Sequence, residues 1–184
     1  MINFNEIKVS TKNPIFNNGE AGEVVASVSV EKNNKVDNRP NWQLIFTDDE
    51  GRTLNEGFYY MDETKYSSQD KFNNSLKYEA GRLKHIIDTL YGEVNYPAFN
   101  TPKEMLDWCM ASIGKKNGSK VKIGVTYGTT KRPNKNGYLG LKSTFPFIFG
   151  NLDEKVLFNK IDLLERPTPS APKEEEPVKD LPWD

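Results

Sequence analysis

The residues with the clearest chemical potential lie in one basic stretch that lacks carboxylates. Residues 108–152 contain eight lysines or arginines and no aspartate or glutamate, although 28% of the whole chain is charged. Because protein surfaces normally mix both signs of charge, a block of one sign indicates a site for a polyanion. The alternative is that these residues cluster by chance on a solvated face.

Six of the eight cations of this block fall on two predicted strands and the loop between them. In the first strand, residues 120–127, apolar side chains alternate with polar ones, and in the second, residues 137–143, Leu139 and Leu141 share the inward face. Alternation therefore predicts an outward basic surface with one aromatic ring, formed by Lys120, Lys122, Lys131, Arg132, Lys135, Tyr138 and Lys142.

A second basic group follows the first predicted strand, at Lys32, Lys35 and Arg39. Outward aromatic rings are expected nearby at Tyr59 or Tyr60, whereas Trp42 shares a face with Leu44 and belongs to the core by the same alternation. Phosphates attract Lys and Arg, and unpaired bases stack on aromatic rings. The combination favours single-stranded nucleic acid and leaves DNA and RNA both open.

The elements that must position these residues form a simple order. Period-2 alternation predicts strands over residues 23–30, 42–46, 53–61, 120–127 and 137–143, and helical spacing predicts helices over residues 76–90 and 101–114. Three strands, a helical insert and two strands are the order of an OB-fold, a five-stranded Greek-key barrel in a mainly β chain with a helical insert (α+β). A jelly roll or β-sandwich with a helical insert is the alternative. Apolar residues between Phe145 and Leu163 are expected to close the core.

Few residues support catalysis. The chain has one histidine, His85, within a helical pattern, and one cysteine, Cys109, on the apolar face of a short helix. Asp48-Asp49-Glu50 precedes Gly51 and is typical of a turn rather than a cation site. No glycine-rich phosphate-binding motif is present. We therefore expect a protein that is not an enzyme and that uses no cofactor and no metal.

The end of the chain differs in composition from the rest. We divide the chain into a folded domain, residues 1–165, and a proline-rich acidic tail, residues 166–184, which is expected to be disordered. The tail ends in an apolar group behind its acids, which is typical of a segment that binds other proteins. Its candidate partner-binding residues are Glu174, Glu175, Glu176, Asp180, Leu181, Pro182 and Trp183.

These features together resemble the single-stranded DNA-binding proteins, particularly those of bacteriophages. The segment VKIGVTYGTTKRPNKNGYLGLKS resembles the fourth and fifth strands of that family, and Asp180 to Trp183 resembles its acidic tip. The resemblance implies a sequence-independent protein that coats single-stranded DNA in viral replication or recombination. It also implies a tail that recruits replication proteins such as polymerase or helicase and competes with DNA for the basic groove. Two features depart from the family pattern: the tip aromatic is tryptophan, and Asp184 follows it.

The remaining sequence features bear on location and on the rival function. The first residues have no basic and apolar signal-peptide pattern, and no run of about 18 apolar residues is present. We expect a soluble protein of the cytoplasm, which is the host cell cytoplasm if the protein is viral. The alternative function is a viral protein–protein adaptor or structural module whose basic block binds an acidic partner.

Overall fold

The computed structural model describes residues 16–33, 39–134 and 137–167. Along the chain, the elements are η2 (Phe16–Gly19), β1 (Gly22–Lys32), β2 (Trp42–Thr47), β3 (Thr53–Phe58), η3 (Glu63–Lys65), α1 (Gln69–Tyr91), α2 (Pro102–Gly114), β4 (Lys120–Thr126), β5 (Gly128–Thr129), β6 (Arg132–Pro133), β7 (Gly140–Leu141) and β8 (Ile148–Phe149). Residues 168–184 of the expected tail, with all of its candidate partner-binding residues, lie outside the described residues, as do Lys35 and Lys135.

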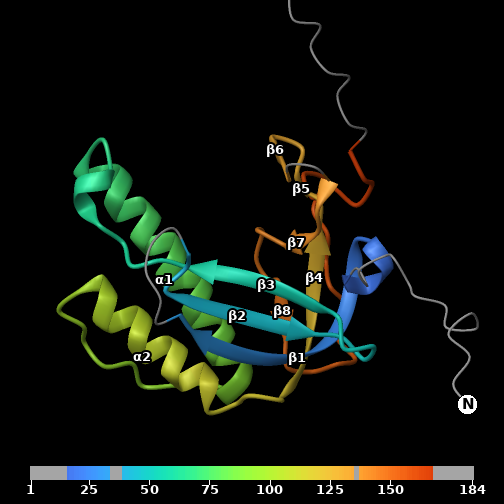
Figure 1. Ribbon diagram of the computed structural model, residues 1–184, viewed down its shortest axis with the longest axis horizontal. Coiled ribbons are helices and arrows are strands. Elements are labelled where there is room, and N and C mark those ends of the chain that lie inside the picture. The colour runs from blue at the N-terminus through green and yellow to red at the C-terminus, as the bar shows by residue number, and fades with distance from the viewer. Residues whose placement is uncertain (1–15, 34–38, 135–136, 168–184) are drawn as a thin grey trace, which may run out of the picture.

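The strands form a nearly closed antiparallel sheet. Its order is β3-β2-β1-β4-β7, and β8 pairs with β4 beside β7. The two ends of this order, β3 and β7, contact each other, so the five strands curve into a barrel-like layer. Figure 1 shows α1 and α2 lying side by side at one side of the strands. The fold is therefore mainly antiparallel β, with a helical insert between β3 and β4.

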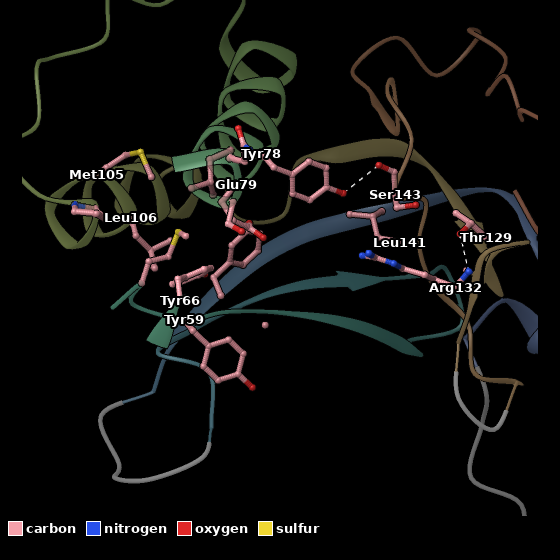
Figure 2. Close-up of a pocket in the computed structure, with 18 of the residues that line it drawn as sticks. Tyr59, Tyr66, Tyr78, Glu79, Met105, Leu106, Thr129, Arg132, Leu141 and Ser143 are labelled. Atoms are coloured by element: carbon pink, nitrogen blue, oxygen red, sulfur yellow. Dashed lines mark hydrogen bonds between the residues drawn. The ribbon is translucent and has the colours of Figure 1, made fainter. Parts of the chain in front are cut away.

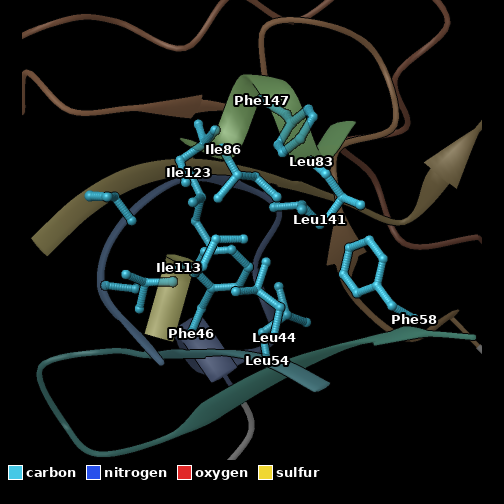
Figure 3. Close-up of a cluster of buried hydrophobic side chains, with 14 of the residues drawn as sticks. Leu44, Phe46, Leu54, Phe58, Leu83, Ile86, Ile113, Ile123, Leu141 and Phe147 are labelled. Carbon is cyan, nitrogen blue, oxygen red and sulfur yellow. The ribbon is translucent and has the colours of Figure 1, made fainter. Parts of the chain in front are cut away.

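Strand register brings the inward side chains into one core. Val28 of β1 lies opposite Phe46 of β2, which in turn lies opposite Leu54 of β3. On the other edge of β1, Val24 lies opposite Ile123 of β4. These side chains are buried with residues of both helices, as Figure 3 shows for the core around Phe46. Period-2 patterning thus directs one face of each strand toward a shared apolar interior.

The predicted strands differ from the structure mainly at their ends. β1, β2 and β4 closely match residues 23–30, 42–46 and 120–127. β3 ends at Phe58, so Tyr59 and Tyr60 follow the strand instead of extending it, and the strand expected over residues 137–143 contains only Gly140–Leu141. Strand boundaries are set by pairing with neighbours, which the local pattern does not encode.

Both helices begin at side-chain caps. In α2, the Thr101 hydroxyl caps the helix by accepting a hydrogen bond from the Glu104 amide at 3.1 Å. The Glu104 carboxylate accepts one from the Asn100 amide. α1 begins at Gln69, earlier than the pattern from residue 76 predicts, because Ser68 caps it. Phe72 adds a further buried position to the first turns of this helix.

The segment after β7 closes only part of the core. Phe147 and Ile148 are buried, as expected, but Phe145, Leu157 and Ile161 are exposed. This segment instead covers the outer face of β4, where a Cβ on Gly124 would lie 2.8 Å from a Val156 methyl carbon. As a result, β4 is buried on both faces beyond its first residue. Among the described residues, no helix is long and apolar enough to cross a membrane.

Candidate functional site

The predicted basic residues separate into three places. Lys32 ends β1 and Arg39 lies in the exposed connection to β2, whereas Lys131 and Arg132 lie on the exposed hairpin of β5 and β6. Lys120 begins β4, and seven residues of strand place it about 20 Å from the hairpin end of that strand. Lys120 also pairs with Asp49 at 2.9 Å. It therefore does not share a surface with the hairpin.

Two lysines that alternation places on the outer surface are buried, and the prediction for them is wrong. The Lys122 ammonium donates to the Glu154 carbonyl at 2.8 Å and lies 3.8 Å from a Glu23 oxygen. The Lys142 side chain is 0% exposed. Both lysines lie under the segment after β7, which covers the face that the alternation assigns to solvent. Neither ammonium is available to a polyanion.

The Lys142 ammonium has a complete set of internal partners. It donates to the carbonyls of Thr144 at 2.9 Å and Pro146 at 3.1 Å, and it lies 3.8 Å from the Asp162 carboxylate. Burial lowers the pKa of Lys142 from its usual value, and the nearby Asp162 carboxylate opposes that shift. The role of Lys142 is structural, because it joins three segments of chain beneath the surface.

The tyrosines that follow β3 take different roles. Tyr59 is 56% exposed, whereas Tyr60 turns toward α2 and packs against the core. The Tyr60 hydroxyl donates to Asp107 at 2.7 Å, and the Lys103 ammonium lies 5.3 Å from the centre of its ring. Burial and the Asp107 hydrogen bond raise the pKa of Tyr60. The expectation that Tyr60 is a stacking surface is therefore wrong, and Tyr59 alone offers an open ring here.

Asp107 also contacts Trp42 and Lys32, which lie near Tyr60. It accepts a hydrogen bond from the Trp42 indole at 2.7 Å, and the Lys32 ammonium lies 3.7 Å from the same oxygen. Trp42 is buried, as predicted. The charge of Lys32 is partly neutralised by this contact, so it contributes less to an anion site than an unpaired cation would.

A groove joins the end of β3 to the hairpin. It has a volume of about 770 Å³ and runs between the barrel and α1. Figure 2 shows Tyr59 at one end and Arg132 at the other, with Tyr66, Tyr78 and Glu79 along the helical side. Met105 and Leu106 of α2 and Leu141 of β7 add apolar surface. The size is within the usual range for small-ligand sites, and the lining combines aromatic and apolar side chains with polar ones. The polar and charged lining residues are Asn74, Ser75, Glu79, Thr129, Arg132, Asn134 and Ser143.

A close contact places Pro40, the chain neighbour of Arg39, beside this groove. Gly57 lines the groove, and a Cβ at this position would lie 2.9 Å from the Pro40 Cβ. Glycine at position 57 therefore allows the connection that carries Arg39 to pass against β3. No salt bridge between described residues involves Arg39, Lys131 or Arg132.

The hairpin at the other end of the groove is fixed by a tight turn and by hydrogen bonds to a neighbouring segment. Gly128 has a φ of +92°, and a Cβ there would lie 2.5 Å from the Arg132 carbonyl, so the tight turn requires glycine. Residues 159–165, which we call the strap, run along the hairpin: the Tyr127 amide donates to the Leu163 carbonyl and the Leu163 amide to the Gly128 carbonyl, at 2.9 and 3.0 Å. These contacts position Arg132 at the mouth of the groove.

Tyr138 lies beside the hairpin and is 67% exposed. The Asn134 side chain donates to its carbonyl at 3.0 Å. Its ring is therefore open to solvent, and the outward orientation predicted from its neighbours is correct.

Tyr66, Tyr78 and Glu79 are among the groove residues that were not identified from the sequence. Tyr66 precedes α1, and Tyr78 lies on α1 four residues before the buried Arg82. Glu79 lies on the apolar face of α1, four residues before Leu83 and seven before Ile86, so a carboxylate at an apolar position was the local signal. The opposing groove wall comes from β3 and β7, which the local sequence does not place.

Glu79 belongs to a partly buried ionic group at the wall of the groove. The Arg82 guanidinium donates to Glu56 at 2.8 Å and lies 4.0 Å from Glu79. The second Glu79 oxygen, Oε2, is buried and has no hydrogen-bond partner among the described residues. Burial raises the pKa of Glu79, with Arg82 opposing the shift and Glu56 adding to it. One cation is thus shared by two carboxylates.

The residues considered for catalysis or metal binding pack in the core or form hydrogen bonds within a turn. His85 packs against Phe147 with ring centres 5.0 Å apart, and burial lowers its pKa. Cys109 is buried, which raises the pKa of its thiol to about 12. Asp48 accepts hydrogen bonds from the Arg52 side chain and from turn amides. Within the described part of the chain, no group of three or more His, Cys, Asp or Glu side chains could hold a metal ion.

Comparison of the chain with protein-family models, with curated proteins and with solved structures finds no match.

Proposed function

We propose that this protein binds single-stranded DNA without requiring a defined sequence and acts in viral DNA replication or recombination. The observation that carries the proposal is the groove between β3, α1 and the hairpin, which is lined by tyrosines and by Arg132. Lys131 neighbours Arg132 on the exposed hairpin, and Pro40, the chain neighbour of Arg39, lies against Gly57 at the other end. Flat rings suit bases and the cations suit phosphates.

We further propose that the barrel is an OB-fold. Support comes from the strand neighbours: β1 pairs with β2 and β4, β3 extends the sheet from β2, and β7 lies between β4 and β3. If β7 is the fifth strand, the connection after β1 and the connection after β4 are the two loops with which OB-folds bind oligonucleotides. Those connections carry Arg39 and the hairpin, respectively.

Single strands fit the groove better than duplexes for a physical reason. A stacked duplex keeps its base faces against one another, so Tyr59 and Tyr78 would find no free base surface there. In a single strand each base can leave its neighbours and lie on a ring, which is worth about 1–3 kcal/mol per base. The proposed ligand surface consists of Arg39, Tyr59, Lys131, Arg132 and Tyr138, with a lesser contribution from Lys32.

For the tail, residues 166–184, we propose a role in recruiting replication proteins such as polymerase or helicase. The support is its sequence: three glutamates precede an apolar end, and its net charge is -2. An acidic segment on the same chain as exposed basic residues is also suited to compete with DNA for those residues.

The proposal is tested by fluorescence anisotropy with a labelled oligo-dT. We expect tight binding that weakens steeply with added salt, with unlabelled duplex competing poorly; an RNA competitor then defines the preference between the two nucleic acids. Absence of binding at low salt would overturn the proposal and favour the adaptor function, in which the basic block binds an acidic protein. The double variant Lys131→Ala/Arg132→Ala should bind more weakly, with Lys120→Ala as the matched control.

A further inference from the structure

The two ends of the groove and its helical wall differ in charge. Arg132 enters from the hairpin, whereas the only charged side chain that lines the helical wall among the described residues is Glu79. Figure 2 places Glu79 on the same wall as Tyr66 and Tyr78, across the groove from the hairpin. A strand of nucleic acid that crosses this space would meet a cation on one side and a carboxylate on the other.

The carboxylate is incompletely satisfied. Glu79 keeps 33% of its side chain exposed, yet its Oε2 atom is buried and accepts no hydrogen bond from the described residues. The nearest cation, Arg82, makes its short contact with Glu56 instead, and Glu79 lies 4.0 Å from it. Rotation about the terminal torsion of a glutamate exchanges the two oxygens, so one oxygen stays buried whichever way the carboxylate turns. The exposed third of the side chain is the part that a ligand in the groove can reach, and an N–H donor there would pair with the carboxylate.

This chemistry selects the part of the nucleotide that faces α1. A phosphate carries only acceptors and negative charge, so it is repelled by Glu79 and attracted to Arg132. The edges of nucleobases carry N–H donors, and their faces stack on rings. The rings available on this wall are Tyr66 and Tyr78. The sugar–phosphate chain is therefore favoured on the hairpin side and the bases on the α1 side.

We propose that the α1 wall of the groove is a base-binding subsite in which Glu79 accepts a hydrogen bond from the exocyclic amino group of a base. This inference rests on the proposed function and deepens it. A comparison of the two pyrimidines tests this hydrogen bond most directly, since cytosine and thymine have similar size and similar ring faces. Cytosine presents an amino donor at the position where thymine presents a carbonyl acceptor. The groove thus binds both pyrimidines, and Glu79 makes the binding of cytosine tighter than that of thymine.

The test uses the full chain and two labelled oligomers of equal length, oligo-dC and oligo-dT, at one salt concentration. The quantity measured is the dissociation constant for oligo-dT divided by that for oligo-dC. A general loss of affinity cancels in this ratio, and a preference for oligo-dC makes it larger than one. Glu79→Gln keeps the shape of the side chain but offers both a donor and an acceptor. We expect this variant to reduce the preference for oligo-dC by about fivefold or more. The control is Glu63→Gln, which changes an exposed acid of η3 and should keep the wild-type ratio.

The outcomes separate this inference from the proposed function. If both oligomers bind and the ratio is the same in the wild type and in Glu79→Gln, the base-binding subsite is wrong while single-stranded DNA binding stands. If neither oligomer binds the wild type, the proposed function itself is wrong. A lower ratio in Glu79→Gln with an unchanged salt dependence supports the subsite, because a phosphate contact would alter the salt dependence.

Discussion

The Lys142 ammonium lies 3.8 Å from the Asp162 carboxylate, and both side chains are fully buried. Asp162 also accepts hydrogen bonds from the Thr144 hydroxyl and the Asn159 amide. The pair therefore ties the end of β7 to the strap, which in turn runs along the hairpin at the mouth of the groove. A residue expected to contact ligand instead stabilises the segment that positions the ligand surface.

Lys142→Ala should lower the free energy of unfolding by about 3–5 kcal/mol, because it leaves a buried carboxylate without its cation. Urea unfolding followed by circular dichroism measures the change. The matched control is Lys120→Ala, which removes an exposed pair with Asp49 and should cost no more than about 1 kcal/mol. Equal stability of the two variants would contradict the structural role of Lys142.

Asp107→Ala should destabilise the protein more at neutral pH than in acid. Burial alone would raise the pKa of Asp107, but hydrogen bonds from Tyr60 and Trp42 outweigh it and hold the pKa below the ordinary value of 3.8. A carboxylate with a lowered folded-state pKa contributes stability that is complete above pH 3.8 and is lost as the pH falls through the folded value. Unfolding curves of both proteins at pH 7 and pH 3 should show the difference shrinking in acid. A difference that grows in acid would be inconsistent with this assignment.

Tyr59→Ala should weaken binding of oligo-dT by about 1–3 kcal/mol without changing its salt dependence, because the ring stacks but carries no charge. Tyr60→Phe is the control: it loses the bond to Asp107 and some stability, but it should bind oligo-dT as the wild type does. Anisotropy titrations give both affinities. An unaffected Tyr59→Ala affinity would remove this ring from the ligand surface.

Arg132→Ala should reduce the slope of log K against log salt by about 1, since one phosphate contact is lost. Lys120→Ala should leave the slope unchanged, because Lys120 lies at the opposite end of β4. Titrations at several salt concentrations compare the two variants directly. If Lys120→Ala changed the slope and Arg132→Ala did not, the DNA path would have to follow the opposite end of the barrel.

Deletion of residues 166–184 should leave the affinity for single-stranded DNA unchanged or raise it. These residues carry a net charge of -2, so their removal takes away a competitor for the basic surface. The same salt titration compares the shortened and full-length chains. A clear loss of affinity would show that the tail contributes to binding and does not oppose it.

The sequence predicts the strands of this fold better than the surfaces they form. Alternation identifies the inward face of β1 and β2 correctly, and it separates Tyr59 from Phe58 and Tyr60. The same rule fails at Lys122, because the segment after β7 covers the second face of β4. A period of two reports that a strand has two faces but not whether a distant segment buries the outer one.

The groove could not be predicted for a related reason. Its walls come from β3, α1 and β7, and their contact depends on the closure of the sheet between β3 and β7. The basic residues of the hairpin were found from composition alone, since a stretch without carboxylates can be recognised in the sequence without knowledge of the fold. Glu79 lies on the apolar face of α1, four residues before Leu83, but the sequence does not show that Arg82 makes its short contact with Glu56 instead.

The strap also determines how the molecule bears mechanical load. Its hydrogen bonds to the hairpin, including the 2.8 Å bond from the Thr130 amide to the Ile161 carbonyl, lie between the described end of the chain at Pro167 and the barrel. Tension applied at Pro167 therefore reaches the hairpin before it reaches β1 and β4. A force applied at Pro167 would therefore distort the hairpin that carries Lys131 and Arg132 before it separates the core strands.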